Sequence, residues 1–339
     1  MKLTKKEIGY IATKYKDATS ISIFKNILDK PEGNEKLSLE KKGILVDGKI
    51  NNEASEIFSI LANAKKSTRL LLQNPDYVLE RYSYKSANKM VLATNDNGDL
   101  KFSISQDFSD VIVEISEFIG MSKIALSNLS LILNPDEMLV LLFLLDSYRK
   151  QFLQQYSGLN SPIKSISELD LVKEMKSDYK NGLAQVLVNS YNFIIPDNTK
   201  LSTIIKSLIE KKLILEEKGY RLNDELEIIA KNFLILENLI LYETFETQKD
   251  DTLLTIGRLV VSAGIHNLMS FMFDGDNIQL DMVSGLQLVT NIEDFLMCPD
   301  LENDIIKEDI SQTNDDTWLC SCGKTNTSNF CSNCGAKRP

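Results

Sequence analysis

The sequence has few of the residues from which enzyme sites are usually built. It contains one histidine, His266, and neither a Gly-x-Gly-x-x-Gly nor a Walker-type lysine loop. A Ser-His-Asp triad would have to use His266, which lies in an apolar, strand-like run and reads more simply as a packed or hydrogen-bonded core residue. Carboxylate pairs such as Glu216-Glu217 and Asp250-Asp251 occur at turns, where they usually mark solvated surface. A carboxylate enzyme with a cleft between two halves has no motif behind it, and we expect no enzymatic activity and no small-molecule substrate.

Long apolar segments are also missing. The longest run, Met138 to Leu145, is far shorter than the roughly 20 residues that a membrane span requires. Residues 1–17 carry positive charges but lack the apolar core of a secretory signal. We therefore expect a cytoplasmic protein that does not insert into membranes.

Positive charge is in deficit. The chain has 38 Lys and Arg residues against 48 Asp and Glu residues, a formal net charge of -10. Broad nucleic-acid binding requires a basic surface that neutralises phosphates, so this balance leaves at most a local basic patch. The content of 43% apolar and 25% charged residues is ordinary for a soluble globular protein. At 339 residues, two or three domains with sizeable cores are expected.

Cysteine is scarce except at the C-terminal end. Four of the five cysteines form two close pairs there, Cys320, Cys322, Cys331 and Cys334. In a reducing compartment this spacing favours a metal site over disulfides, although redox chemistry is an alternative. Four thiolates on two glycine-containing turns suit tetrahedral Zn(II). Because protein ligands fill all four positions, the zinc should be structural.

The tail from residue 318 to residue 339 resembles bacterial zinc ribbons and the Ran-binding-protein type of zinc finger. Trp318 and Asn326 stand where that finger type has a tryptophan and an asparagine, whereas its first cysteine pair is spaced more widely than Cys320-x-Cys322. The resemblance implies contacts with RNA bases or ubiquitin, but basic residues are few here. Packing of Trp318 over the zinc site is the simpler interpretation.

An acidic segment separates this tail from the rest. Residues 299–317 contain seven acidic residues and one basic residue, Lys307, for a net charge of -6. Few apolar residues remain to build a core, so a flexible linker is predicted.

One stretch occurs twice. Residues 39–53, LEKKGILVDGKINNE, return as residues 209–225, IEKKLILEEKGYRLNDE, with Asn51 answered by Asn223. Chance recurrence of Lys-Lys and Ile-Leu pairs is the alternative, but the length of the shared order favours duplication. A spacing near 170 residues indicates duplicated subdomains rather than a solenoid. Each copy has the order of a winged-helix wing and leads into a helix, short strands, a glycine hairpin and a closing helix.

These patterns predict an α+β fold of two pseudo-symmetric halves, each with helices and a small antiparallel sheet, followed by a small zinc ribbon. The expected boundaries are residues 1–125 for the first half, 126–298 for the second half with a long helical insert, 299–317 for the linker and 318–339 for the ribbon. The long helix after Asn134-Pro135, apolar nearly all round from Met138 to Leu145, should be buried, most simply between the halves.

The body resembles the EspG family, the cytosolic chaperones of type VII secretion. Leu39 to Leu45, Asp47-Gly48 and Ile50 to Glu53 carry the resemblance, which is one of order and spacing over residues 1–297. It implies a non-enzymatic adaptor that binds a secreted helical-hairpin protein and keeps it soluble for export. A C-terminal zinc ribbon and a Lys-, Asn- and Ile-rich composition depart from the family pattern.

The alternative is a winged-helix nucleic-acid-binding regulator with the ribbon as an accessory contact. A DNA-reading helix should be strongly basic on its exposed face, and the segment from Ser20 to Lys30 offers only Lys25 and Lys30. The sequence therefore favours a protein partner.

Overall fold

The strands of the two halves, which carry alternating apolar residues, form one antiparallel sheet. The computed structural model describes residues 1–27, 29–87, 89–105, 109–159, 162–177, 182–247, 253–273, 275–298, 318–319 and 325–326. The first half contributes the strands β1 (Lys2–Leu3), β4 (Lys66–Gln73), β5 (Val78–Ser86), β6 (Lys89–Asp96) and β7 (Asp99–Ser105). The second half contributes β8 (Ser130–Leu133), β11 (Asn238–Thr247), β12 (Leu253–Ser262), β13 (Leu268–Phe273) and β14 (Ile278–Val283).

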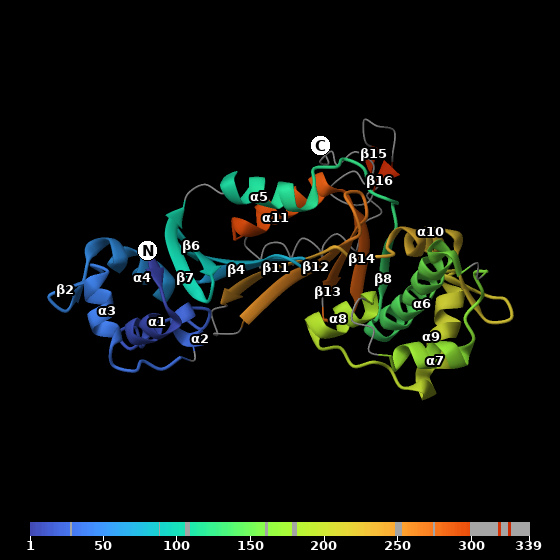
Figure 1. Ribbon diagram of the computed structural model, residues 1–339, viewed down its shortest axis with the longest axis horizontal. Helices are drawn as coiled ribbons and strands as arrows, with labels where there is room; N and C mark the ends of the chain where they lie inside the picture. The colour runs from blue at the N-terminus through green and yellow to red at the C-terminus, as the bar shows by residue number, and fades with distance from the viewer. Residues whose placement is uncertain are drawn as a thin grey trace.

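The strand order is β1-β7-β6-β5-β4-β11-β12-β13-β14-β8, so the two halves meet where β4 pairs with β11 (Figure 1). That seam is in register from Lys66 opposite Glu246 to Gln73 opposite Leu239. The α+β class is confirmed, but the expectation of a small separate sheet in each half is wrong. Two small sheets would each expose the unpaired backbone of a long edge strand, and pairing β4 with β11 removes both edges.

Helices follow the same order in each half. The first half has α1 (Lys5–Ala12), α2 (Ile23–Asn26), α3 (Glu35–Lys41), the hairpin β2 (Leu45–Val46) and β3 (Lys49–Ile50), α4 (Asn52–Ala62) and, after the strands, α5 (Ser109–Ile119). The second has α6 (Pro135–Gln154), a π turn (Gln155–Leu159), α7 (Glu168–Met175), α8 (Leu183–Tyr191), α9 (Asn198–Glu210), the hairpin β9 (Ile214–Glu216) and β10 (Tyr220–Leu222), α10 (Asp224–Asn232) and α11 (Gly285–Leu296). Over the described ranges, no helix combines the length and apolar character of a membrane-crossing segment.

Three apolar clusters hold these layers together. One lies under α1 to α4, one surrounds α6, and the third lies between the sheet and the pair α5 and α11. The apolar segment from Met138 to Leu145 is buried, as expected, but inside the second lobe rather than between the halves. Its helix contacts α7, α8, α9 and α10, and its apolar residues share a core with Leu259 and Phe271 of the sheet. We call α1 to α4 with their hairpin the first lobe, and α6 to α10 with theirs the second lobe.

A buried glutamate joins the opening helix of each lobe to the helix before its hairpin. Glu7 closes a capping box with Thr4 at the start of α1 and also accepts hydrogen bonds from Ser38 Oγ (2.7 Å) and Lys42 Nζ (2.7 Å). Its exposed fraction is 2%. Because Ser38 and Lys42 lie one helical turn apart, both side chains reach the same carboxylate.

Glu137 repeats the arrangement. It closes a capping box with Asn134 and accepts hydrogen bonds from Ser207 Oγ (2.5 Å) and Lys211 Nζ (2.6 Å). Burial raises the pKa of both glutamates, but the hydrogen bonds from lysine, serine and backbone outweigh it and hold each pKa below its usual 4.5. The repeat is therefore a structural duplication that includes a buried polar joint.

The structural register of the repeat differs by one residue from the sequence alignment at the helix end. The alignment pairs Lys42 with Lys212, whereas the shared glutamate contact pairs Lys42 with Lys211. The next residues, Gly43 (φ 70°) and Lys212 (φ 59°), both take left-handed conformations. The sequence alignment matched identical residues. The backbone conformation instead makes Gly43 and Lys212 equivalent, so this helix end has a glycine in one copy and a lysine in the other.

Candidate protein-binding groove

The two faces of the sheet are covered differently. Helices α5 and α11 lie side by side across the middle of one face, and their cluster includes Leu70, Ile240 and Val260 from the central strands (Figure 1). The opposite face, which we call the lower face, carries the two lobes toward its ends (Figure 1). The seam between β4 and β11 thus faces a space between two lobes.

A groove of about 680 Å³ lies on the lower face between α2 and the seam. We call it the seam groove. Its apolar walls include Ile21, Ile23, Ile27, Tyr82, Phe245 and Leu253. Ser67, Arg69 and Glu80 add polar groups, so the lining comes from the first lobe and from strands of both halves. Leu253, the first residue of β12, is 52% exposed.

Cross-strand register explains why these side chains meet. Phe245 lies opposite Ser67 on one side and opposite Thr255 on the other. Two residues along, Glu243 lies opposite Arg69, and Arg69 lies opposite Tyr82. Because side chains alternate between faces along a strand, these two rows point to the lower face. The groove floor is therefore a consequence of the seam.

An ion-pair network crosses the seam at its centre. Arg69 donates from Nε to Glu80 (2.9 Å) and from Nη1 to Glu243 (3.3 Å), and Tyr82 donates its hydroxyl to Glu80 (2.7 Å). Burial raises the pKa of Glu80, but the hydrogen bonds from Tyr82 and Arg69 outweigh it and leave the pKa below its usual range. Burial, aided by Glu80, raises the pKa of Tyr82 to about 12. The groove floor therefore presents a fixed network of paired charges.

An approximate twofold axis relates the two halves and passes through this network. Arg69 and Glu243 each lie four residues before the end of their strand and pair with each other. The pair of Phe245 with Ser67 likewise corresponds to that of Leu71 with Leu241. Residues on the first-half side of the groove thus have counterparts on the second-half side.

On the second-half side, the chain covers its own sheet. Helix α8 lies beneath β13 (Figure 1), and the rings of Tyr191 and Phe193 pack on Phe273 with centroids 6.1 Å and 5.0 Å away. Gly257, opposite Glu243, carries no side chain at the position where the first half has Tyr82. The corresponding helix of the first lobe, α2, has four residues against nine in α8. The groove is thus open where the second half places a longer helix and two aromatic rings.

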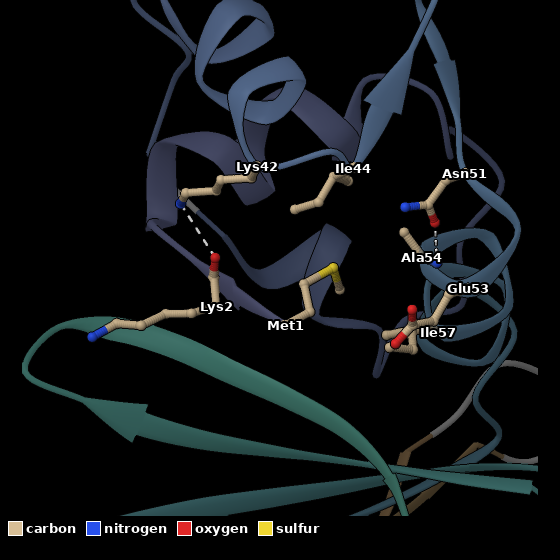
Figure 2. Close-up of a pocket in the computed structure, with 8 residues that line it drawn as sticks. All are labelled: Met1, Lys2, Lys42, Ile44, Asn51, Glu53, Ala54 and Ile57. Atoms are coloured by element: carbon tan, nitrogen blue, oxygen red, sulfur yellow. Dashed lines mark hydrogen bonds between the residues drawn. The ribbon is translucent and has the colours of Figure 1, made fainter.

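A second, smaller pocket of about 420 Å³ lies in the first lobe, where β1, the end of α3 and α4 meet (Figure 2). We call it the first-lobe pocket. It is lined by Met1, Lys2, Lys42, Ile44, Asn51, Glu53, Ala54 and Ile57. Figure 2 shows Met1, Ile44 and Ala54 turned toward one another, with the Lys2 ammonium group directed away. The repeated stretch 39–53 contains four residues of the first-lobe pocket, Lys42, Ile44, Asn51 and Glu53. No sequence pattern singled out the residues of the seam groove, because they come from distant strands and helices.

His266 is not the core residue that its apolar neighbours suggested. It is exposed in the turn between β12 and β13, and its Nδ1 is 2.6 Å from Ser122 Oγ. Gly264 in this turn has φ 93°, which ends the strand run before His266. Ser122 Oγ is also 3.0 Å from the carbonyl oxygen of Ile124. Among the described residues no carboxylate pairs with His266, so this contact lacks the third group of a triad.

The predicted zinc ligands Cys320, Cys322, Cys331 and Cys334 lie outside the described residues, as do the acidic linker and the pair Asp250-Asp251. In the tail, the structure describes only the short antiparallel pair of β15 (Trp318–Leu319) and β16 (Thr325–Asn326). Within the described ranges, no cluster of His, Cys, Asp and Glu side chains has the arrangement of a metal site. The zinc site therefore stays a prediction.

No protein-family model matches the sequence, and no curated protein matches it. Among solved structures, the chain is similar to the type VII secretion system chaperone EspG5 of Mycobacterium tuberculosis, determined in complex with a PE25–PPE41 dimer. The TM-score is 0.48 and the sequence identity is 9%, over 89% of this chain and 97% of that chain. At this level the similarity assigns a role to no residue of this chain.

Proposed function

We propose that this protein is a cytoplasmic, non-enzymatic adaptor that binds a secreted helical-hairpin protein of a type VII system in the seam groove. The observation that carries the proposal is the uncovered lower face beside α2. Its apolar walls, Phe245 and Leu253 among them, surround a floor whose charges are already paired. Such a surface suits an apolar protein segment better than a charged small molecule.

The second half shows what kind of element fits this surface. There, the short helix α8 and the aromatic residues after it lie against the lower face. A partner helix that ends in exposed apolar residues would make comparable contacts with Tyr82, Phe245 and α2. Helix-in-groove binding of this kind uses apolar residues at helical spacing. The tip of a helical hairpin presents such residues before export, and covering them would keep the client soluble.

The assignment of the client to a type VII system rests on the sequence order shared with the EspG family. That order includes the helix end at Leu39 to Leu45, the turn at Asp47-Gly48 and the following helix. In the structure these segments form α3, the β2–β3 hairpin and α4. Two of the lysines beside the hairpins, Lys42 and Lys211, are ion-paired to Glu7 and Glu137 and give the nucleic-acid alternative no support.

The test is affinity capture from the native cytosol followed by quantitative mass spectrometry. The baits are the full chain, a groove variant carrying Phe245→Ala and Leu253→Glu, and a control variant, Val113→Glu. Val113 is 56% exposed on α5, on the opposite face of the sheet, so it matches Leu253 in exposure. We expect small helical secreted proteins on the full chain and the control, and their loss from the groove variant.

Two results would contradict the proposal. Capture of nucleic acid, or of no helical secreted protein at all, would favour the regulator. Equal capture by the groove variant and the control would place the client elsewhere on the molecule. Thermal unfolding of all three proteins checks that the groove variant is folded.

A further inference from the structure

The first-lobe pocket has a counterpart in the second lobe that is filled. Asn51 caps α4 by accepting from the Ala54 N–H (2.7 Å), and its side chain donates to the Gly43 carbonyl (2.7 Å). Asn223 caps α10 by accepting from the Leu226 N–H (2.9 Å), and its side chain donates to the Lys212 carbonyl (3.0 Å). The two caps make the same pair of hydrogen bonds. They therefore place Ala54 and Leu226 at equivalent positions.

The other lining residues follow the same correspondence. Ile44 donates its N–H to the Leu39 carbonyl, and Leu213 donates to the Leu208 carbonyl, in each case at the end of the helix before the hairpin. Each also accepts from the N–H of its capping asparagine. Three residues beyond Ala54 and Leu226, Ile57 corresponds to Ile229. The walls of the pocket are therefore aliphatic in both lobes.

Size is what differs between the two sites. Leu226 is fully buried and belongs to the core around α6, together with Leu213 and Ile229. In the first lobe, the equivalent Ala54 lacks three carbon atoms of the leucine side chain, and a pocket of about 420 Å³ lies beside it. In the second lobe, an isobutyl side chain thus packs among the equivalent aliphatic residues.

The two lysines that line the pocket are already ion-paired. Lys42 is ion-paired with Glu7 (2.7 Å) and also donates to the Lys2 carbonyl (3.2 Å). Lys2 lies 2.9 Å from Asp96 and 3.6 Å from Asp99. Neither lysine is left to bind the carboxylate of a free amino acid. A side chain carried by a polypeptide, whose backbone is uncharged, brings no carboxylate that would need one of these paired lysines.

We propose that the first-lobe pocket binds the side chain of a leucine presented by another polypeptide. The leucine takes the place that Leu226 occupies in the second lobe, against Ile44, Ala54 and Ile57. The pocket shares no lining residue with the seam groove. This site therefore stands independently of the client proposed above.

The probe for the test is N-acetyl-leucine amide, which carries the side chain between two uncharged amides. The full chain is labelled with ¹³C at the isoleucine δ1 methyl groups, and the probe is titrated by NMR. We expect saturable shifts of the Ile44 and Ile57 signals and none of the Ile229 signal. Ala54→Leu, which copies the second lobe, should abolish the shifts by filling the pocket from within.

The ligand series keeps the test decisive if Ala54→Leu fails to fold. N-acetyl-glycine amide lacks the side chain and should leave the Ile44 and Ile57 signals in place. Free leucine should shift them less than the capped form at equal concentration. Absence of shifts with N-acetyl-leucine amide, equal shifts with the glycine amide, or undiminished shifts in a folded Ala54→Leu protein would each overturn the proposal. Tighter binding of free leucine would instead identify an amino-acid site, which also contradicts it.

Discussion

The two lobes share a joint and differ in the helices attached to it. In both, a glutamate at the start of the first helix is held by a serine and a lysine one turn apart. The first lobe opens with α1, of 8 residues, and the second with α6, of 20 residues. Only α6 carries a fully buried ion pair, Asp146 with Arg149. The hydrogen bonds that the two lobes share fix the helix before each hairpin. The longer helix α6 also supports the further helices of the second lobe.

The buried pair explains why only one side of the lower face is covered. Asp146 accepts hydrogen bonds from the N–H groups of Leu183 (2.9 Å) and Ala184 (3.1 Å), the first residues of α8. Arg149 donates to the carbonyl of Phe233, at the end of α10. The pair therefore fixes α8 and α10 on α6. The first lobe has no such anchor among its described residues, and its short α2 leaves the seam groove open.

Removing the buried anchor should give the largest loss of stability. Asp146→Ala leaves the Arg149 guanidinium without its carboxylate and frees two N–H groups of α8. Breaking a buried pair in this way costs about 3–5 kcal/mol. We expect a loss of that size in urea unfolding, with hydrogen exchange rising in α8 and not in α1 to α4. A loss below about 1 kcal/mol would show that the pair is not what fixes α8.

The shared joint should contribute equally in both lobes. Glu7→Gln and Glu137→Gln each weaken two charge-assisted hydrogen bonds and should cost about 2 kcal/mol apiece. Because the two sites lie in separate lobes, the costs should add in the double variant. Urea denaturation at neutral pH measures them. Markedly unequal costs would show that the two joints are equivalent in geometry only.

The same glutamates make stability depend on pH. Their pKa values are lower in the folded protein than the usual 4.5, so their contribution is fully present above about pH 4.5. It is lost as the pH falls through the lowered pKa values and the carboxylates become protonated. We expect the urea midpoint to fall in that window, and to fall less steeply in the double glutamine variant. Parallel pH profiles would contradict this assignment.

The one-residue correction to the repeat predicts opposite effects of matched substitutions. Gly43→Ala places a Cβ at φ 70° and should cost about 1 kcal/mol. Lys212→Gly relieves the same conformation at φ 59° and should stabilise the protein by about 0.5–1 kcal/mol. Leu213→Gly removes a buried side chain and should destabilise it. If Leu213→Gly were tolerated and Lys212→Gly were not, the alignment read from the sequence would be the correct one.

The tail should affect the two lobes least of all. We predict one zinc per chain bound by Cys320, Cys322, Cys331 and Cys334, because four thiolates at this spacing suit tetrahedral zinc. Elemental analysis of protein purified without chelator measures it, and a result of no metal would be incompatible with the ribbon. Truncation after Cys298 should leave the thermal transition of the lobes unchanged. Loss of that transition would show that the tail is part of their fold.

Much of the fold could be read from local patterns. The capping residue Asn134 with Pro135 located the start of α6. The strands expected in each half are present, because alternating apolar residues and turn glycines are local signals. The edge strands β1 and β8 were missed. With two and four residues, they are too short to show a period.

The candidate site could not be predicted from the sequence. Arg69 and Glu243 are 174 residues apart, and nothing near either residue indicates that they pair. Ala54 is an ordinary helix residue until its counterpart Leu226 is recognised, and the alignment had placed the helix ends one residue apart. Sites assembled by long-range pairing leave no spacing pattern in the chain.

By itself, the sequence determined the duplicated plan, the α+β class and the elements within each half, because capping, periodicity and turn residues act over a few neighbours. It also predicts the zinc ligands, whose chemistry depends on local spacing. Only the tertiary structure decided that β4 and β11 join the halves into one sheet. It also decided that α8 covers one side of the lower face and that a groove stays open on the other. Those outcomes depend on which edges and apolar faces meet, and contacts between residues far apart in the chain settle that.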